Sequence, residues 1–253
     1  MLYYIYDKTF EGLMTCVFEA FSRKELPEQI IEQNHSIPLF SDFFEVISDT
    51  EKAERVLNGL KNKISQSALN MLFVSYLSEL NNIEIHIFNY VKKALLSSVN
   101  IELNFADNDV LFLSKIYKKV QNETTYMKQF VRFQKTADGI YFAMMEPKYN
   151  VLPLCSDFFQ NRYADQQWII YDKIRKYGLY YDLETIEIIY FDKPPVFSSF
   201  GKLSSEQQDD TEILFQNMWK NYLESITISE RKNLRLRRQH MPKRFWKYLT
   251  EKN

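Results

Sequence analysis

The chain has 253 residues, a net charge of −1 and 45% hydrophobic residues. These values suit one large domain or two smaller ones and exclude a disordered chain. The near-neutral total also excludes a uniformly basic nucleic-acid-binding protein, although it leaves room for a local basic patch. No stretch approaches the roughly 20 apolar residues that span a bilayer, and the start has no signal-peptide pattern. The two cysteines, Cys16 and Cys155, fit a reducing cytosol, so we expect a cytoplasmic protein without membrane contact.

The first part of the chain predicts one short strand followed by several helices. The run Leu2–Tyr6 is β-type, and apolar residues recur at helical spacing between Phe10 and Phe21. Three further segments carry the apolar stripe of an amphipathic helix, and each stripe must be buried against another element. These segments span residues 53–64, 69–80 and 83–95.

A polar segment marks the expected boundary between two regions. Residues 97–109 break the apolar pattern of the preceding helices. We therefore expect a strand and a mainly helical region over residues 1–104. An α+β domain with a basic, aromatic C-terminal tail should follow over residues 105–253.

The second region predicts a long helix followed by a small sheet. Apolar residues between 113 and 134 trace one helix, Asp138 and Gly139 signal a turn, and a short helix is expected over 155–163. Four runs have the composition of strands. These runs span residues 140–145, 168–171, 179–182 and 185–191. Because the last three are joined by short connections, they predict an antiparallel meander.

A further helix is expected after the sheet. Its start is marked by a capping box, with serines at 204–205 and glutamines at 207–208. The acidic pair at 209–210 then falls in the first turn, where the helix dipole favours negative charge. The apolar stripe of this helix should be buried. It consists of Leu214, Phe215, Met218, Trp219, Tyr222 and Ile226.

These elements predict an α+β fold. We expect an antiparallel sheet of about four to five strands, covered by helices, with a helical region in the N-terminal half. The strand Leu2–Tyr6 can join the sheet built by residues 140–191. In that case the helical region over residues 53–99 is an insertion or subdomain.

The chain lacks the sequence patterns of common cofactor sites. Its five glycines are widely separated, the closest pair being Gly178 and Gly201, so neither a P-loop nor a dinucleotide-binding fingerprint can form. The histidines lie apart from one another and from the cysteines, which excludes the usual zinc patterns, and two cysteines cannot ligate an iron–sulfur cluster. We therefore expect no cofactor and no metal, although spacing alone leaves a carboxylate-only site open.

The C-terminal tail combines cations with aromatic residues. Between Arg231 and Lys252 it carries nine Lys and Arg residues, and the nearby acids are Glu230 and Glu251. Cations neutralise phosphates and aromatic rings stack on bases, so the tail is a candidate for contact with a polyanion. The alternative is a segment that docks onto an acidic body of the same chain, anchored by its aromatic residues.

Two other basic segments extend this candidate surface. The long helix carries six Lys and Arg residues between 115 and 135 against a single acid, and the segment 157–175 carries two arginines whose planar side chains suit phosphate or carboxylate. The alternatives are a solvated helix face and an ordinary Asp172–Arg175 pair. The residues expected to contact nucleic acid are Lys128, Arg132, Arg162, Trp168, Arg175, Arg237, Arg238, Lys243, Arg244 and Trp246.

Three segments of the chain resemble one bacterial family. They are YYIYDKTFEGLMTCVFEAF near the start, PLCSDFFQNRYADQQWIIYDKIRKYGLYYD in the middle and RRQHMPKRFWKYLTE near the end. The family is that of probable DNA metabolism proteins linked to a radical SAM protein. Its C-terminal part is a domain of unknown function, which in some bacteria is fused to a uracil-DNA glycosylase family domain. The resemblance covers nearly the whole chain in order, and MPKRFWKYL is its most specific piece.

The resemblance implies a role in DNA repair or modification, beside a radical SAM enzyme that carries the iron–sulfur chemistry. This is an association and not a mechanism. Our leading hypothesis is an accessory protein that binds DNA. One alternative is a metal-independent, glycosylase-like hydrolase with Asp157, Asp172 or His240 as acid or base. The other is a protein-interaction module that does not contact nucleic acid.

Overall fold

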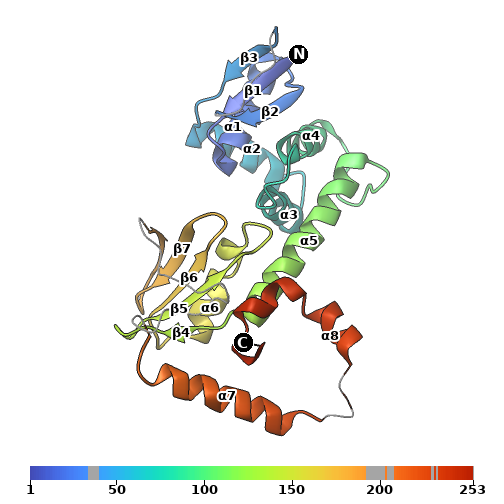
Figure 1. Cartoon of the computed structure of the whole chain (residues 1–253). Helices are drawn as coiled ribbons and strands as arrows, with labels where there is room; N and C mark the ends of the chain where they lie inside the picture. The colour runs from blue at the N-terminus through green and yellow to red at the C-terminus, as the bar shows by residue number, and fades with distance from the viewer. Residues whose placement is uncertain (34–39, 192–202, 204–207, 229–230, 232, 253) are drawn as a thin grey trace. The chain divides into compact units, whose positions relative to one another are not determined.

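The computed structural model describes residues 1–33, 40–191, 203, 208–228, 231 and 233–252. The chain divides into two compact units, Met1–Gln121 and Asn122–Asn253, and each has its own β-sheet (Figure 1). The division falls within the long helix α5 (Asn108–Phe130), whose existence the apolar periodicity predicts.

The first unit is built on a three-stranded parallel sheet. Strand β1 (Leu2–Tyr6) lies at its centre, between β2 (Gln29–Glu32) and β3 (Asp42–Glu45). The expectation that Leu2–Tyr6 joins the later sheet is therefore wrong. Both edges of β1 already pair with parallel neighbours, and Tyr4 and Tyr6 are fully buried in the core of this unit.

Besides the first part of α5, the first unit contains four helices of the described residues, and the sequence pattern predicts all four. They are α1 (Phe10–Arg23), α2 (Thr50–Lys61), α3 (Gln66–Tyr76) and α4 (Ile83–Leu96). Three of them begin with a side-chain cap, in which Thr9, Asp49 and Ser65 each accept a hydrogen bond from a backbone N–H of the first turn. Apolar residues of each helix, such as Leu13 and Leu72, form the buried core.

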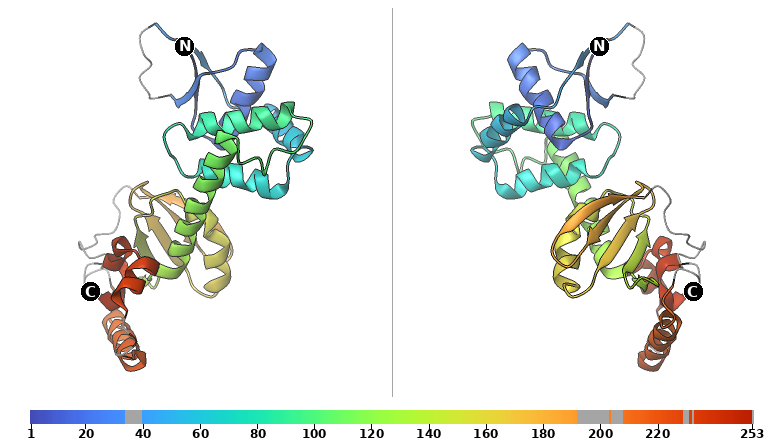
Figure 2. Two further views of the ribbon diagram at one scale, coloured as in Figure 1. Left: turned by 90° about the vertical axis from the view of Figure 1, so that its right-hand side faces the viewer. Right: turned by 90° about the vertical axis from the view of Figure 1, so that its left-hand side faces the viewer.

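The second unit holds the predicted antiparallel sheet. Its strand order is β4-β5-β6-β7-β8, and the meander of the last three strands is confirmed. Strands β5 and β6 are parallel because helix α6 (Ser156–Arg162) lies between them in sequence and covers one face of the sheet (Figure 2). The strands are β4 (Gln134–Lys135), β5 (Tyr141–Met145), β6 (Trp168–Asp172), β7 (Tyr177–Tyr181) and β8 (Ile186–Tyr190).

An aromatic cluster forms the core between α6 and the sheet. Trp168 on β6 is fully buried and lies within 6.3 Å, between ring centres, of Phe133, Phe159 and Tyr181. On the neighbouring strand, Gly178 leaves room for β6, because an added Cβ would stand 3.0 Å from the carbonyl oxygen of Ile170. The expected α+β fold is thus confirmed, with a helical region in the N-terminal half.

The C-terminal segment folds back onto α5. It contains α7 (Glu212–Ile226), α8 (Leu234–His240) and the short 3₁₀ turns η3 (Lys243–Tyr248) and η4 (Thr250–Lys252). Phe245 is buried to 1% exposure and packs on Tyr126 and Phe130 of α5, with ring centres 5.8 and 5.4 Å away. The part of the tail around Phe245 is therefore docked onto the same chain through an aromatic residue, as the alternative to a polyanion contact predicts.

Helix α7 differs from its prediction in two ways. It begins at Glu212, and the proposed capping residues at 204, 205 and 207 lie outside the described residues. Asp209 instead precedes the helix, where its N–H donates to the carbonyl oxygen of Lys135. The apolar stripe is not buried: its large side chains are mostly more than half exposed. They are Leu214, Phe215, Met218, Trp219, Tyr222 and Ile226, joined by Ile213.

Replacing the buried anchor of the tail should destabilise the second unit. We expect Phe245→Ala to lower the free energy of unfolding by about 3–5 kcal/mol, because it removes a packed ring from the core. All three tryptophans lie in this unit, so urea unfolding followed by tryptophan fluorescence reports on it. Ile188→Ala, at a side chain with 59% exposure, is the control and should change the value by less than about 0.5 kcal/mol. Equal stability of the two variants would contradict the docking.

Candidate functional site

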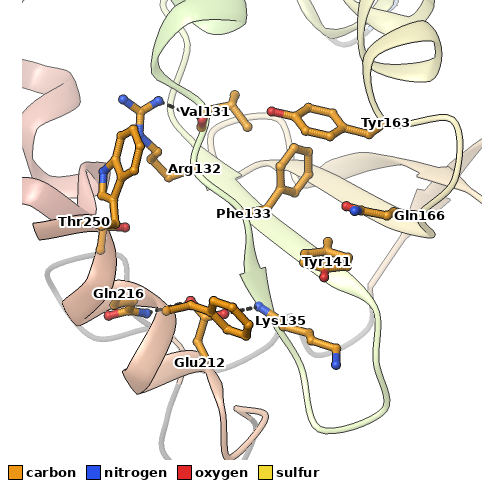
Figure 3. A pocket seen from close by; sticks show the side chains of 12 residues that line it. Val131, Arg132, Phe133, Lys135, Tyr141, Tyr163, Gln166, Glu212, Gln216 and Thr250 are labelled. Atoms are coloured by element: carbon orange, nitrogen blue, oxygen red, sulfur yellow. Dashed lines mark hydrogen bonds between the residues drawn. The ribbon is translucent and has the colours of Figure 1, made fainter. Parts of the chain in front are cut away.

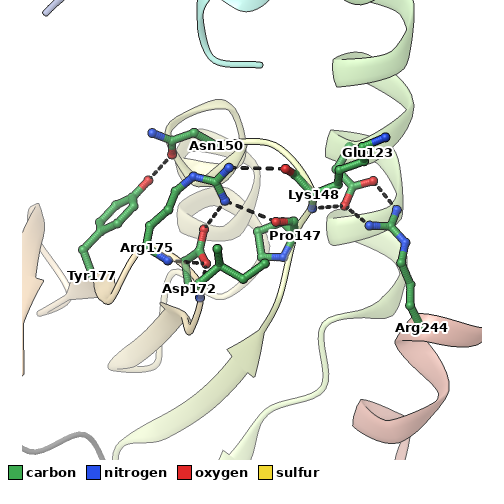
Figure 4. A network of polar contacts seen from close by, with 9 residues as sticks. Glu123, Pro147, Lys148, Asn150, Asp172, Arg175, Tyr177 and Arg244 are labelled. Atoms are coloured by element: carbon green, nitrogen blue, oxygen red, sulfur yellow. Dashed lines mark hydrogen bonds and ion pairs between the residues drawn. The ribbon is translucent and has the colours of Figure 1, made fainter. Parts of the chain in front are cut away.

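The buried carboxylate of Asp172 organises the turn between β6 and β7. It accepts hydrogen bonds from the backbone N–H groups of Ile174 and Arg175 and, over 2.9 Å, from the Arg175 guanidinium (Figure 4). The same guanidinium donates to the carbonyl oxygens of Pro147 and Lys148. Arg175 therefore forms the ordinary pair with Asp172 and not a phosphate clamp, because the donors of its guanidinium already bind groups inside the protein.

A second buried carboxylate holds the C-terminal tail. Glu123 on α5 is 3% exposed and binds both terminal nitrogens of Arg244. It also accepts the backbone N–H of Lys148 over 2.8 Å. A further carboxylate, Glu146, pairs with Lys247 of the tail. Arg244, predicted to contact nucleic acid, thus has a structural role in this position.

The three candidate catalytic residues do not form one site. Burial raises the pKa of Asp172 above its ordinary value, although Arg175 opposes this. Asp157 lies exposed in the first turn of α6 and accepts a hydrogen bond from Ser156, and His240 is exposed at the end of α8. Within the described residues, no contact joins any two of the three candidates.

Two of the predicted nucleic-acid contacts are aromatic, and the structure places them differently from the prediction. Trp168 is fully buried beneath α6 and has no surface to offer a ligand, so its expected contact is wrong. Trp246 is half-buried, and its indole N–H donates to the carbonyl oxygen of Met241. Both rings serve the packing of the second unit.

The remaining predicted cations differ in whether the fold already pairs them with a carboxylate. Arg132 pairs with Glu251 over 3.0 Å and is only partly accessible. Lys128 lies 5.4 Å from the ring centre of Phe158, and Arg162 lies 6.0 Å from that of Tyr163. Arg162, Arg238 and Lys243 are exposed, whereas the side chain of Arg237 lies outside the described residues.

The second unit also contains a pocket of about 480 Å³ (Figure 3). Its walls come from the segment after α5, the β4–β5 hairpin, the segment after α6, helix α7 and the turn η4. The lining residues are Val131, Arg132, Phe133, Lys135, Tyr141, Tyr163, Gln166, Glu212, Phe215, Gln216, Trp219 and Thr250.

Five of the lining residues carry aromatic rings. Phe133 and Tyr163 meet edge to face, with ring centres 5.2 Å apart and planes at 75°. On the opposite wall, Arg132 lies 6.0 Å from the ring centre of Trp219, and the Trp219 N–H donates to Glu251. The pocket is therefore mainly an aromatic surface with a few fixed polar groups, which is the usual composition of a small-molecule site.

The charged groups of the pocket already bind neighbouring groups of the chain. Glu212 is 7% exposed and accepts hydrogen bonds from the backbone N–H of Lys135 and from the Gln216 amide. The Lys135 ammonium pairs with Asp209 over 3.0 Å. As a result, each full charge in the lining already has a partner within the described residues.

Three polar groups of the lining are left for a ligand. The hydroxyls of Tyr141 and Tyr163 and the side-chain amide of Gln166 make no hydrogen bond within the described part of the chain. Sequence reasoning missed these residues and Glu212. Tyr163 and Gln166 lie in the segment 157–175, which the sequence marks as a candidate because of its two arginines. No local sequence pattern marks Tyr141 or Glu212 as site residues.

The described residues also limit two other kinds of site. Among them, no three His, Cys, Asp or Glu side chains are grouped so that they could hold a metal ion. Within the same residues, no helix is both long and apolar enough to cross a membrane.

Comparison with known proteins gives one match. Residues 81–251, about two thirds of the chain, match the model of a family described as a domain of unknown function, DUF4130. The match includes every residue of the aromatic pocket and both carboxylates of the buried network. No curated protein and no solved structure matches the chain.

The entry to α7 should depend on pH through Asp209. The hydroxyl and N–H of Thr211, together with Lys135, lower the pKa of this carboxyl from 3.8 to about 2. Because the folded-state pKa is lowered, the stabilising effect is complete above about pH 4 and is lost as the pH falls towards 2. Thr211→Val should raise the Asp209 pKa, measured by NMR titration, and the exposed Thr227→Val should not. An unchanged pKa in Thr211→Val would contradict this assignment.

Proposed function

We propose that this chain, which belongs to the DUF4130 family, binds single-stranded DNA with its second unit and presents it to a partner enzyme. The observation that carries the proposal is an aromatic pocket flanked by an exposed arginine. Arg162 directly precedes the pocket residue Tyr163 and lies over its ring. A cation beside stacking surfaces is the combination by which proteins bind unpaired strands.

The structure divides the predicted cations by their use inside the protein. Arg132, Arg175 and Arg244 each bind a carboxylate. To contact a phosphate they would have to exchange that carboxylate, which gains little net charge interaction. The proposed phosphate contacts are therefore the cations of the set that pair with no carboxylate of the described residues, namely the exposed Arg162, Arg238 and Lys243 and the half-buried Lys128.

The proposal assigns the chemistry to a partner. Asp172 is occupied by the Arg175 turn, and Asp157 and His240 lie elsewhere on the surface, so the three offer no common acid–base site. This favours an accessory protein over the hydrolase alternative. The resemblance implies that the partner is a radical SAM enzyme acting in DNA repair or modification.

Binding should depend on salt through the exposed cations. We expect the affinity for a single-stranded oligonucleotide to fall with rising salt, with a slope of about −0.7 in log K against log salt for each phosphate neutralised. Arg162→Ala and Lys243→Ala should each reduce the slope by about 0.7, measured by fluorescence anisotropy. Lys61→Ala in the first unit is the matched control and should leave it unchanged. No binding at low salt, or an affinity that ignores salt, would overturn the proposal.

A second candidate function is a protein-interaction module, and helix α7 favours it. Contiguous exposed apolar residues on one helix are uncommon on monomeric proteins and mark contact surfaces. On α7 the exposed fractions of Leu214, Met218 and Tyr222, which follow one another at a spacing of four residues on one face, lie between 54% and 59%. Because Phe215 and Trp219 of the same helix line the pocket, a partner bound to this face would lie next to the bound strand.

A charge placed on α7 should weaken that contact. We expect Met218→Asp to reduce co-purification with the radical SAM partner about tenfold after nuclease treatment, because a carboxylate would enter an apolar interface. Asn217→Asp adds the same charge at a neighbouring exposed position and should retain the partner. Met218 does not line the pocket, so DNA binding should be unaffected. Full co-purification of Met218→Asp would exclude this face.

A further inference from the structure

We propose that the aromatic pocket holds one unstacked base of the bound DNA strand. This inference rests on the proposed function and specifies which part of the DNA strand the pocket binds. Its volume of about 480 Å³ lies within the roughly 300–1,000 Å³ typical of small-ligand sites. A single base with its sugar is a ligand of this class.

The walls favour a flat ring. Phe133 and Tyr163 line it next to each other (Figure 3), and α7 contributes Phe215 and Trp219 to the lining. Phe215 is 58% exposed and Trp219 is 38% exposed, so two large rings face solvent at the pocket instead of packing in a core. Every base has a π-face, and aromatic side chains bind unpaired bases by stacking.

The charges exclude a phosphate from the interior. The two cations in the lining, Arg132 and Lys135, pair with Glu251 and Asp209. A phosphate of the strand placed between them would also meet the buried carboxylate of Glu212. A neutral base is not repelled by Glu212. The phosphates of its strand are expected to lie outside the pocket, where they can contact the exposed Arg162.

The unpaired polar groups suit the edge of a base. The Gln166 amide offers two donors and one acceptor, and the hydroxyls of Tyr141 and Tyr163 each both donate and accept. None of the three is hydrogen-bonded within the described residues. Bases display alternating donors and acceptors along their edges, which enzymes and binding modules read in this way once the base is unstacked.

The test uses an oligonucleotide with one 2-aminopurine, whose fluorescence changes when it leaves the stack. We expect the wild-type chain to bind it and change its emission. Phe215→Ala and Gln166→Leu should each weaken binding about tenfold and suppress the emission change. The matched controls are Met218→Ala on the same helix and Gln167→Leu beside Gln166. Both positions lie outside the lining, and both variants should behave as wild type.

An otherwise identical oligonucleotide with an abasic site separates the pocket from the phosphate contacts. It should bind more weakly than the 2-aminopurine strand, and the pocket variants should not weaken it further. If both strands bind equally to wild type and variants, with normal salt dependence, the base pocket is wrong while DNA binding stands.

If no oligonucleotide binds, 2-aminopurine riboside serves as the probe. Quenching of the Trp219 emission, identified by its loss in Trp219→Phe, would support the base pocket and overturn strand binding. No quenching in that case would overturn both.

Discussion

The hydrogen bonds to the buried carboxylate of Glu123 are the interaction on which the assembly of the second unit depends most. It lies on α5, yet it binds the guanidinium of Arg244 from the end of the chain and the N–H of Lys148 from the loop after β5. One group therefore ties a helix, a sheet connection and the tail together. A buried carboxylate without such donors would be strongly destabilising, so the three segments must assemble jointly.

This constraint changes the meaning of the basic tail. In the sequence, nine cations gather near the C-terminus and suggest one polyanion-binding stretch. In the fold, Arg244 and Lys247 bind Glu123 and Glu146, and Phe245 fills a gap against α5. The tail is thus a structural element that closes the unit, and only its outward-facing cations are available to a ligand.

The sequence predicts the elements better than their partners. Apolar periodicity locates the helices and the meander, because each depends on residues close in sequence. It does not reveal β2 and β3, which are only four residues long and pair with β1 across the chain. Nor does it reveal that α7 keeps its stripe exposed, since the same stripe suits a core or a contact surface. For the site, it locates Arg162 but not Glu212, because the pocket walls converge only in the fold.

The pocket and the carboxylate network have a common cause. Arg132 lies two residues beyond the end of α5, and Glu251, its partner, lies in the last turn of the docked tail. The pairing fixes the wall that includes Trp219, because Glu251 also accepts the indole N–H. Docking of the tail therefore both neutralises the cation in the lining and positions an aromatic ring beside it. The result is an aromatic pocket whose two cations are paired and whose remaining charge is the Glu212 carboxylate, and this favours an uncharged flat ligand over a phosphate.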